Sequence, residues 1–380
     1  MLKIHYSLES ELQHGISDIE APSELNIQVR NLVLKTKKGK QVARGEMIAE
    51  HPSKFGGAYH AAASGKVMKV NYYHMTIKCD GGEDAVEPVD VSSMEPGKDL
   101  LRALQDLGIG VSALAPVKTL VINGLNPEPG ISVTEQLLKD EKETVEAGLE
   151  MVRRFMTPEK TVLAVAAGAS YELSGSSVHT VKPKYPNCLD ALVVKSVTGK
   201  ELPSDTKVLS VMDLYEIGTV VRTGMPLTHT VMTVAGRNYR VPLGTPIRHL
   251  MDSLNMNVTT GDTVVLGGPF RGDAVYSLDE GVKKGDHGLF SIASSTFPAI
   301  QDAACINCGE CVLKCPARIQ AHLISRYAEY EMFEMAEKHG LNNCFECGLC
   351  GFNCISRRPL LQYIRFAKAQ LKASRQSEQG

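Results

Sequence analysis

The sequence predicts a multidomain α+β protein whose last quarter is a small, cysteine-rich helical domain. The chain has 380 residues, more than one compact core of ordinary size usually holds. Short β-rich runs fill the first quarter, and a strand, helix, strand order follows in the middle. Eight of the ten cysteines then fall between Cys305 and Cys354. These three observations indicate several domains of different class.

Composition excludes some classes of protein. Hydrophobic residues make up 43% and charged residues 22%, the balance of a soluble globular protein. The formal net charge is -2, so the strongly basic surface of a nucleic-acid-binding protein is not expected. No apolar stretch approaches the roughly 20 residues that cross a bilayer, and the first residues carry charges where a secretory signal has an apolar core. We therefore expect a cytoplasmic location.

The first domain is predicted to be a small all-β module. Glycine turns separate β-rich runs over residues 27–89, which are IQVRNLVL, QVARGEMIA, GAYHAAASGKVMKV and HMTIKC. A lipoyl carrier is one interpretation of such a module, but no lysine stands at the tip of a hairpin between matched strands. Three histidines have no helical ligand spacing and are expected to be structural: His51, His60 and His74.

The middle of the chain is predicted to be an α/β layer followed by further strands. A helix is expected at Asp99–Leu107, strands at Thr119–Asn123 and Thr161–Gly168, and a helix between these strands to about Met156. The segment GIGVSA after the first helix has glycines at nucleotide-loop spacing, but it follows a helix and is expected to be a loop. Strand alternation in HTVMTV and NYRVPL, then a turn at Thr245, precedes a short helix.

The cysteine spacing is the strongest functional signal. Four cysteines followed by Pro316 form the CxxCxxCxxxCP run of bacterial ferredoxins, and a second set repeats the spacing without the proline. Three cysteines of each run can hold one cubane, while the fourth ligates the other cluster. We therefore assign one [4Fe-4S] cluster to Cys305, Cys308, Cys311 and Cys354, and a second to Cys315, Cys344, Cys347 and Cys350.

Other interpretations of the cysteines are weaker. Zinc sites usually use paired CxxC steps without a third cysteine and a trailing proline. The isolated Cys79 and Cys188 are expected to be ordinary small apolar side chains.

Two helices are predicted to flank the cysteine motifs. One spans Ala317–Lys338, and the other begins after Pro359. Five cations on or just before the second helix either dock an acidic partner or, as we expect, form a solvated face: Arg357, Arg358, Arg365, Lys368 and Lys372.

Taken together, these motifs resemble the RnfC family of the Rnf electron-transport complex. The resemblance is carried by VINGLNPEPGISVTEQLL, KYPNCLDALVVKSVTGKELP, TGMPLTHTVMTVAGRNYRVPLGTPIRHLM, GGPFRGDAVYSL and the two ferredoxin motifs, and it covers nearly the whole chain. More distantly, the middle resembles the NADH- and FMN-binding subunit of complex I. The resemblance implies a barrel-sandwich hybrid module at 1–95, an α/β flavin-type domain at 96–205, a β-grasp (SLBB) domain at 206–297 and a two-cluster ferredoxin domain at 298–380.

The same resemblance implies an FMN site, at which NAD would react, but the sequence departs from it. The family's glycine-rich flavin loop is represented by Gly108 and Gly110 followed by VSALAP. Remaining flavin contacts would be Asn123, Glu128 and Gly130. Because close-approach glycines are missing, we expect this site to be degenerate.

We therefore expect an electron-transfer subunit without a catalytic acid, base or nucleophile. It would pass single electrons between a ferredoxin or cytochrome-type carrier and Rnf-type membrane subunits, as a peripheral protein on the inner face of the membrane. One alternative is a fully NADH- and FMN-active member of the RnfC family. Another is a soluble corrinoid reductase of this type that works outside a membrane complex.

Overall fold

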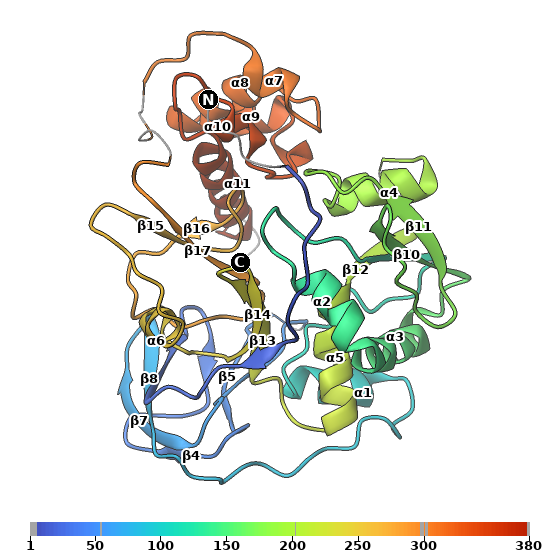
Figure 1. Ribbon diagram of the computed structural model, residues 1–380, viewed down its shortest axis with the longest axis vertical. Coiled ribbons are helices and arrows are strands. Elements are labelled where there is room, and N and C mark those ends of the chain that lie inside the picture. The colour runs from blue at the N-terminus through green and yellow to red at the C-terminus, as the bar shows by residue number, and fades with distance from the viewer. Residues whose placement is uncertain (1–5, 54, 202, 297–299, 301–302, 378–380) are drawn as a thin grey trace. The chain divides into compact units, whose positions relative to one another are not determined.

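The computed structural model describes the whole chain except residues 1–5, 54, 202, 297–299, 301–302 and 378–380. It divides into two compact units (Figure 1). The larger comprises residues 5–268 and 273–291, and the smaller comprises residues 269–272 and 292–380. The expected domain boundary at 297–298 lies outside the described residues. The fold is mixed α/β, as predicted.

Two antiparallel sheets near the N-terminus share one apolar core. The strands of the first sheet, in spatial order, are β2 (Glu24–Gln28), β8 (His74–Cys79), β7 (Gly65–Val70) and β4 (Gln41–Val42). Those of the second are β3 (Val33–Leu34), β5 (Met47–Glu50) and β6 (Tyr59–His60). Alternate residues such as Leu25 and Ile77 point into the core and are fully buried. Every predicted β-rich run of this region therefore contains strand.

The next sheet is parallel and carries helices. Its strands, in spatial order, are β11 (Ser177–Val181), β10 (Lys160–Ala166), β9 (Thr119–Asn123) and β12 (Thr206–Ser210). The helices of this region are α1 (Lys98–Asp106), α2 (Val133–Asp140), α3 (Lys142–Met156), α4 (Asp190–Thr198) and α5 (Val211–Thr223). Figure 1 shows α2, α3 and α5 side by side. The predicted strand, helix, strand order is confirmed, but the single predicted helix is two, because Glu141 leaves the helical conformation at φ -121°.

Glycines allow α3 and α5 to approach each other closely. A Cβ on Gly148 would lie 1.9 Å from the Leu214 carbonyl oxygen, and one on Gly218 would lie 1.8 Å from the Thr144 carbonyl oxygen. Real side chains never come this close, so only glycine fits at either position. At the start of α5, Ser210 and Asp213 form a reciprocal capping box.

A mixed sheet completes the larger unit. Its strands, in spatial order, are β1 (Ser17–Asp18), β14 (Arg237–Pro242), β13 (His229–Val234), β17 (Gly288–Ile292), β15 (Thr263–Leu266) and β16 (Asp273–Ala274). The predicted hairpin is β13–β14, and the predicted short helix is α6 (Ile247–Ser253). Met232, Val241 and Leu250 are buried between this helix and the sheet.

The smaller unit is helical. Its elements are α7 (Glu310–Leu313), α8 (Ala321–Glu329), α9 (Phe333–Lys338), the 3-10 turn η1 (Leu341–Asn343), α10 (Leu349–Phe352) and α11 (Leu360–Ser377). The helix predicted after Pro359 is confirmed. The helix predicted over Ala317–Lys338 is wrong in part: it begins at Ala321 and breaks after Glu329. Glu331 adopts a left-handed φ of 57° at the break.

Candidate metal centre

The two cysteine motifs fold into two similar loops, each leading into a short helix. Gly309 precedes α7 with φ 79°, and Gly348 precedes α10 with φ 74°. Two residues before each glycine, Asn307 and Glu346 also have positive φ, at 54° and 53°. The repeated spacing therefore gives a repeated backbone, in which a tight loop presents successive cysteines on its inner side.

Four cysteines surround a first cavity, the first-quartet cavity. They are Cys305, Cys308, Cys311 and Cys354. Cys354 comes from the second motif, so the chain brings residues from both motifs to this cavity. Its other polar lining includes His322, Ser356 and Arg358.

The remaining four cysteines surround a second cavity, the second-quartet cavity. They are Cys315, Cys344, Cys347 and Cys350. Cys315 comes from the first motif, and Ile319, Leu361 and Ile364 add apolar walls. The structure thus groups the eight cysteines as the sequence assigned them, with the fourth cysteine of each motif at the other cavity. The ligand roles themselves stay a prediction.

The electrostatics of the thiols are those of a site that needs a cation. Burial raises the pKa of Cys347 to about 11, and it also raises the pKa of Cys344 and Cys350. Neighbouring thiols of the same quartet add to these shifts, since negative charges close together repel. Burial likewise raises the pKa of Cys311 in the first quartet. A metal centre that displaces the thiol protons offsets both costs, so the donor set fits iron–sulfur clusters.

A site for a single metal ion is a different arrangement from a cluster site. Within the residues that the structure describes, no three side chains among His, Cys, Asp and Glu are placed to hold one metal ion.

Backbone groups also point at sulfur. The Glu346 N–H donates to the Cys344 Sγ at 3.4 Å. Such N–H···S bonds stabilise the reduced, more negative state of a cluster and so adjust its potential.

The cations near α11 do not form the solvated face expected from the sequence. Arg358 is only 5% exposed; it donates to the Ala303 carbonyl at 2.7 Å and to Glu329 at 2.6 Å. Arg365 and Lys368 both pair with Glu346, at 3.2 and 2.7 Å. The expectation was wrong because these cations meet carboxylates from elements distant in sequence.

The isolated cysteines have other surroundings. Cys188 is buried and donates to the Pro127 carbonyl at 3.1 Å. Cys79 is half-buried in β8. Both lie in the larger unit, away from the motifs in sequence.

Three residues predicted as flavin contacts lie at or after the end of β9, where their groups contact other protein groups. Asn123 donates to the Cys188 carbonyl and to Asp190, both at 2.8 Å. Glu128 is 4% exposed, and a Cβ on Gly268 would lie 2.2 Å from its Cδ. Gly130 has φ 82° and faces the Phe290 ring.

The remaining two predicted flavin residues, Gly108 and Gly110, lie in the loop after α1. The Gly108 N–H donates to Gln105 and the Val111 N–H donates to Phe55, both to backbone carbonyls at 2.9 Å. Lys284 donates to the Gly108 carbonyl at 2.8 Å. These amides therefore serve the protein's own packing, which does not fit a loop that cradles a phosphate.

Sequence analysis missed a buried polar network beside these residues. Asn126 donates to the Leu8 carbonyl at 3.0 Å and to Glu135 at 2.9 Å, and Ser10 also donates to Glu135. The N-terminal segment thereby closes over the start of α2. No local pattern could reveal this contact, because its partners are more than a hundred residues apart.

In the described part of the chain, none of the helices has the length and apolar character required to span a membrane.

Comparisons with known proteins agree with the cysteine grouping. Residues 297–356 match the family model described as a 4Fe-4S dicluster domain. The RnfC-type subunit of the proton-translocating ferredoxin:NAD(+) oxidoreductase complex of Clostridium ljungdahlii is 25% identical, over 90% of this chain and 85% of that protein. The equivalent subunit of the Na(+)-translocating ferredoxin:NAD(+) oxidoreductase complex of Acetobacterium woodii is 26% identical, over 89% of this chain and 88% of that protein.

Other matches cover less of their partners. The RnfC-type subunit of the ion-translocating oxidoreductase complex of Klebsiella pneumoniae is 30% identical over 69% of this chain, which spans only 38% of that longer protein. Among solved structures, a chain of an NAD+-reducing [NiFe]-hydrogenase in the H2-reduced state matches with a TM-score of 0.44 and 15% identity, over 74% of this chain and 67% of that chain.

Proposed function

We propose, from the confirmed similarity of this chain to the RnfC-type subunits of ion-translocating oxidoreductase complexes, that it is an electron-transfer subunit of an Rnf-type complex. It passes single electrons through two [4Fe-4S] clusters, between a ferredoxin or cytochrome-type carrier and the other subunits. The observation that carries this proposal is the sorting of eight cysteines into two quartets, each around its own cavity.

The protein's contribution is placement and environment. When bound, each cluster supplies reversible one-electron chemistry. The first quartet holds one cluster and the second quartet holds the other, and the exchanged Cys315 and Cys354 keep the two sites close together. Leu361 and Ile364 exclude water from the second-quartet cavity. The ion pairs of Glu346 with Arg365 and Lys368 fix the loop that carries Cys344 and Cys347.

FMN and NAD are not part of this proposal. The relatives in Clostridium and Acetobacterium belong to complexes whose names include NAD(+), which keeps a fully NADH-active protein as the alternative. Against it stand the loop amides of Gly108 and Val111, which bond to the protein itself. Asn123 is likewise engaged by Cys188 and Asp190. Loss of charge-assisted amide bonds costs about 1.5 to 3 kcal/mol each, so a loop without them binds flavin phosphate poorly. The soluble corrinoid reductase has no observation of its own in its favour.

The domain organisation in this proposal follows the resemblance. The paired antiparallel sheets would be the barrel-sandwich hybrid module of 1–95, the parallel sheet the flavin-type domain of 96–205, and the mixed sheet the β-grasp (SLBB) domain of 206–297. The cysteine region, 298–380, would be the two-cluster ferredoxin domain. As part of such a complex, the chain would lie on the inner face of the membrane beside membrane-bound subunits.

Flavin content and NADH activity separate the proposal from its alternative. The full chain is purified anaerobically, assayed for FMN, and tested for NADH-dependent viologen reduction. We expect clusters that dithionite reduces, no stoichiometric FMN and no NADH turnover. One FMN per chain with NADH turnover would establish the alternative instead.

A further inference from the structure

The internal repeat allows each residue of the first motif to be compared with its counterpart in the second. Gly309 corresponds to Gly348, Cys308 to Cys347, and Leu313 to Phe352. Because the two loops share their backbone conformation, a difference in covering between counterparts reflects what packs on them and not how they fold.

The second motif is covered by another part of the smaller unit, the segment 269–272. A Cβ on Gly348 would lie 2.1 Å from the Phe270 carbonyl oxygen. The Phe270 ring packs edge-to-face on Phe352, with centroids 5.2 Å apart. Arg365 donates to the Arg271 carbonyl at 2.7 Å, which ties this segment to α11. Cys347 is accordingly only 7% exposed.

The first motif is open at the equivalent positions. Among the residues that the structure describes, none has an atom within 4 Å of a Cβ built on Gly309. Leu313, the counterpart of Phe352, is 77% exposed, and Ile306 beside the first-quartet cavity is 61% exposed. Cys308 is exposed where Cys347 is buried.

We propose that the cluster of the first quartet is the one that exchanges electrons with protein partners outside the chain, and that the cluster of the second quartet is an inner relay. This inference rests on the proposed function. Electron transfer between proteins slows steeply with distance, so an exposed thiolate and an uncovered loop give a partner its shortest approach at Cys308. The step moves one electron between the cluster and a one-electron carrier protein, with no bond made or broken and no proton transferred.

A protein-sized acceptor tests this order. Cys347→Ser leaves the first-quartet cluster intact, and Cys308→Ser leaves the second-quartet cluster intact. Each full-length variant is reduced with dithionite, the excess is removed, and oxidation by mitochondrial cytochrome c is followed by stopped flow. We expect the chain that retains the first cluster to react close to the wild-type rate, and the chain that retains only the second to react about tenfold or more slowly. Equal rates, or the reverse order, would overturn the proposal.

A second measurement on the unaltered protein covers the case in which a variant loses both clusters. The wild-type chain is poised so that one cluster at a time is reduced, and a hydrophilic dysprosium chelate is added while EPR power saturation is recorded. Where the variants fold, the signal that each one lacks assigns the two signals to their quartets. We expect one signal to relax strongly and the other weakly, the strongly relaxed one being that absent from Cys308→Ser.

Equal relaxation of both signals would contradict an exposed and an inner cluster. A chain that contains no iron at all would instead refute the proposed function, so the two failures are distinguishable.

Discussion

At the scale of single residues, the quartet cysteines differ from Cys188 in what surrounds them. Cys347 meets three other thiols around one cavity, whereas Cys188 bonds to a backbone carbonyl. We predict that Cys347→Ser lowers the iron content and abolishes one EPR signal while the other remains, because one cluster loses a thiolate ligand. Cys188→Ser is the matched control and should keep both signals. Two intact signals in Cys347→Ser would refute the ligand assignment.

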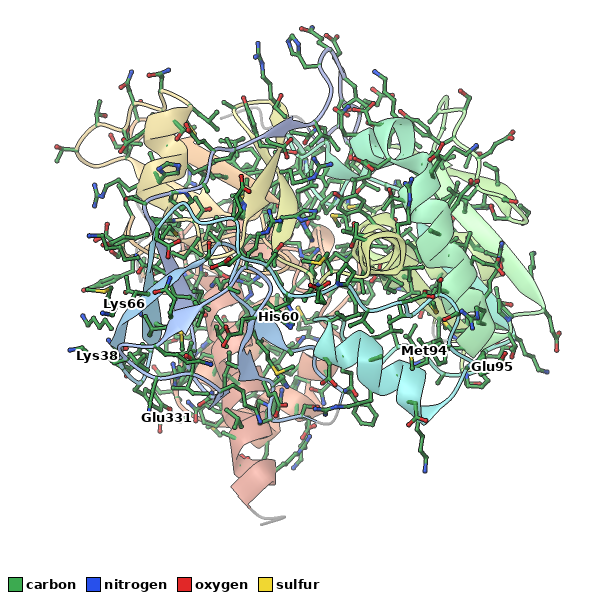
Figure 2. All side chains as sticks on the ribbon, turned by 90° about the horizontal axis from the view of Figure 1, so that it is seen from below. Lys38, His60, Lys66, Met94, Glu95 and Glu331 are labelled. Carbon is green, nitrogen blue, oxygen red and sulfur yellow. The ribbon has the colours of Figure 1, made fainter. Side chains whose placement is uncertain are left out.

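His60 gives a second residue-scale prediction. It is 3% exposed, and burial, with Lys284 nearby, lowers its pKa to about 4. Figure 2 shows it among the side chains between the N-terminal strands and α1. The unfolded chain binds a proton near pH 6.5 and the folded chain only near 4, so stability falls as the pH decreases through this window.

Urea unfolding at pH 7.5 and 5.5 measures this effect. From the two pKa values, His60 accounts for a loss of about 1 kcal/mol between these pH values. His60→Phe should lose less stability than wild type by about that amount, while the exposed His14→Gln should behave as wild type. An unchanged pH dependence in His60→Phe would show that His60 is not buried in its neutral form.

Residue roles were predictable where spacing alone determines them. The ferredoxin spacing predicted which eight cysteines meet, because ligand reach along a short loop is a local property. The burial of Arg358 was not predictable, since its partner Glu329 comes from another helix. The same holds for Lys368, whose partner Glu346 lies in the second cysteine loop.

At the scale of elements, the contact between α3 and α5 depends on glycine. We predict that Gly148→Ala destabilises the larger unit by about 1 to 3 kcal/mol, because its Cβ would overlap the Leu214 carbonyl and force the helices apart. Thermal unfolding followed by circular dichroism measures the change. Glu150→Ala on the exposed side of α3 is the control, and it should change stability little. Equal stability of Gly148→Ala and wild type would contradict this packing.

Helix existence was predictable from apolar periodicity, but helix ends were less so. The break after α8 is a Schellman motif, in which the Met332 N–H donates to the Tyr327 carbonyl and the Glu331 N–H to the Ala328 carbonyl. Glycine normally marks the left-handed position of this motif. Here Glu331 occupies it, so the sequence contained no stop signal, and the prediction ran α8 and α9 together.

At the scale of the whole molecule, the mixed α/β architecture and the dicluster region followed from the sequence, because both rest on local periodicity and spacing. The closure of the N-terminal segment over Asn126 did not, since it depends on contacts between distant parts of the chain. The loss of free amides in the Gly108 loop has the same origin, because Phe55 and Lys284 reach it through tertiary structure.

Metal and sulfide analysis of the full chain, purified without oxygen, tests most directly whether this protein is an electron carrier. Two [4Fe-4S] clusters require about eight iron and eight acid-labile sulfide ions per chain, with a brown colour that dithionite bleaches. A colourless protein, or one with zinc in the thiol quartets in place of iron, would contradict the electron-transfer function.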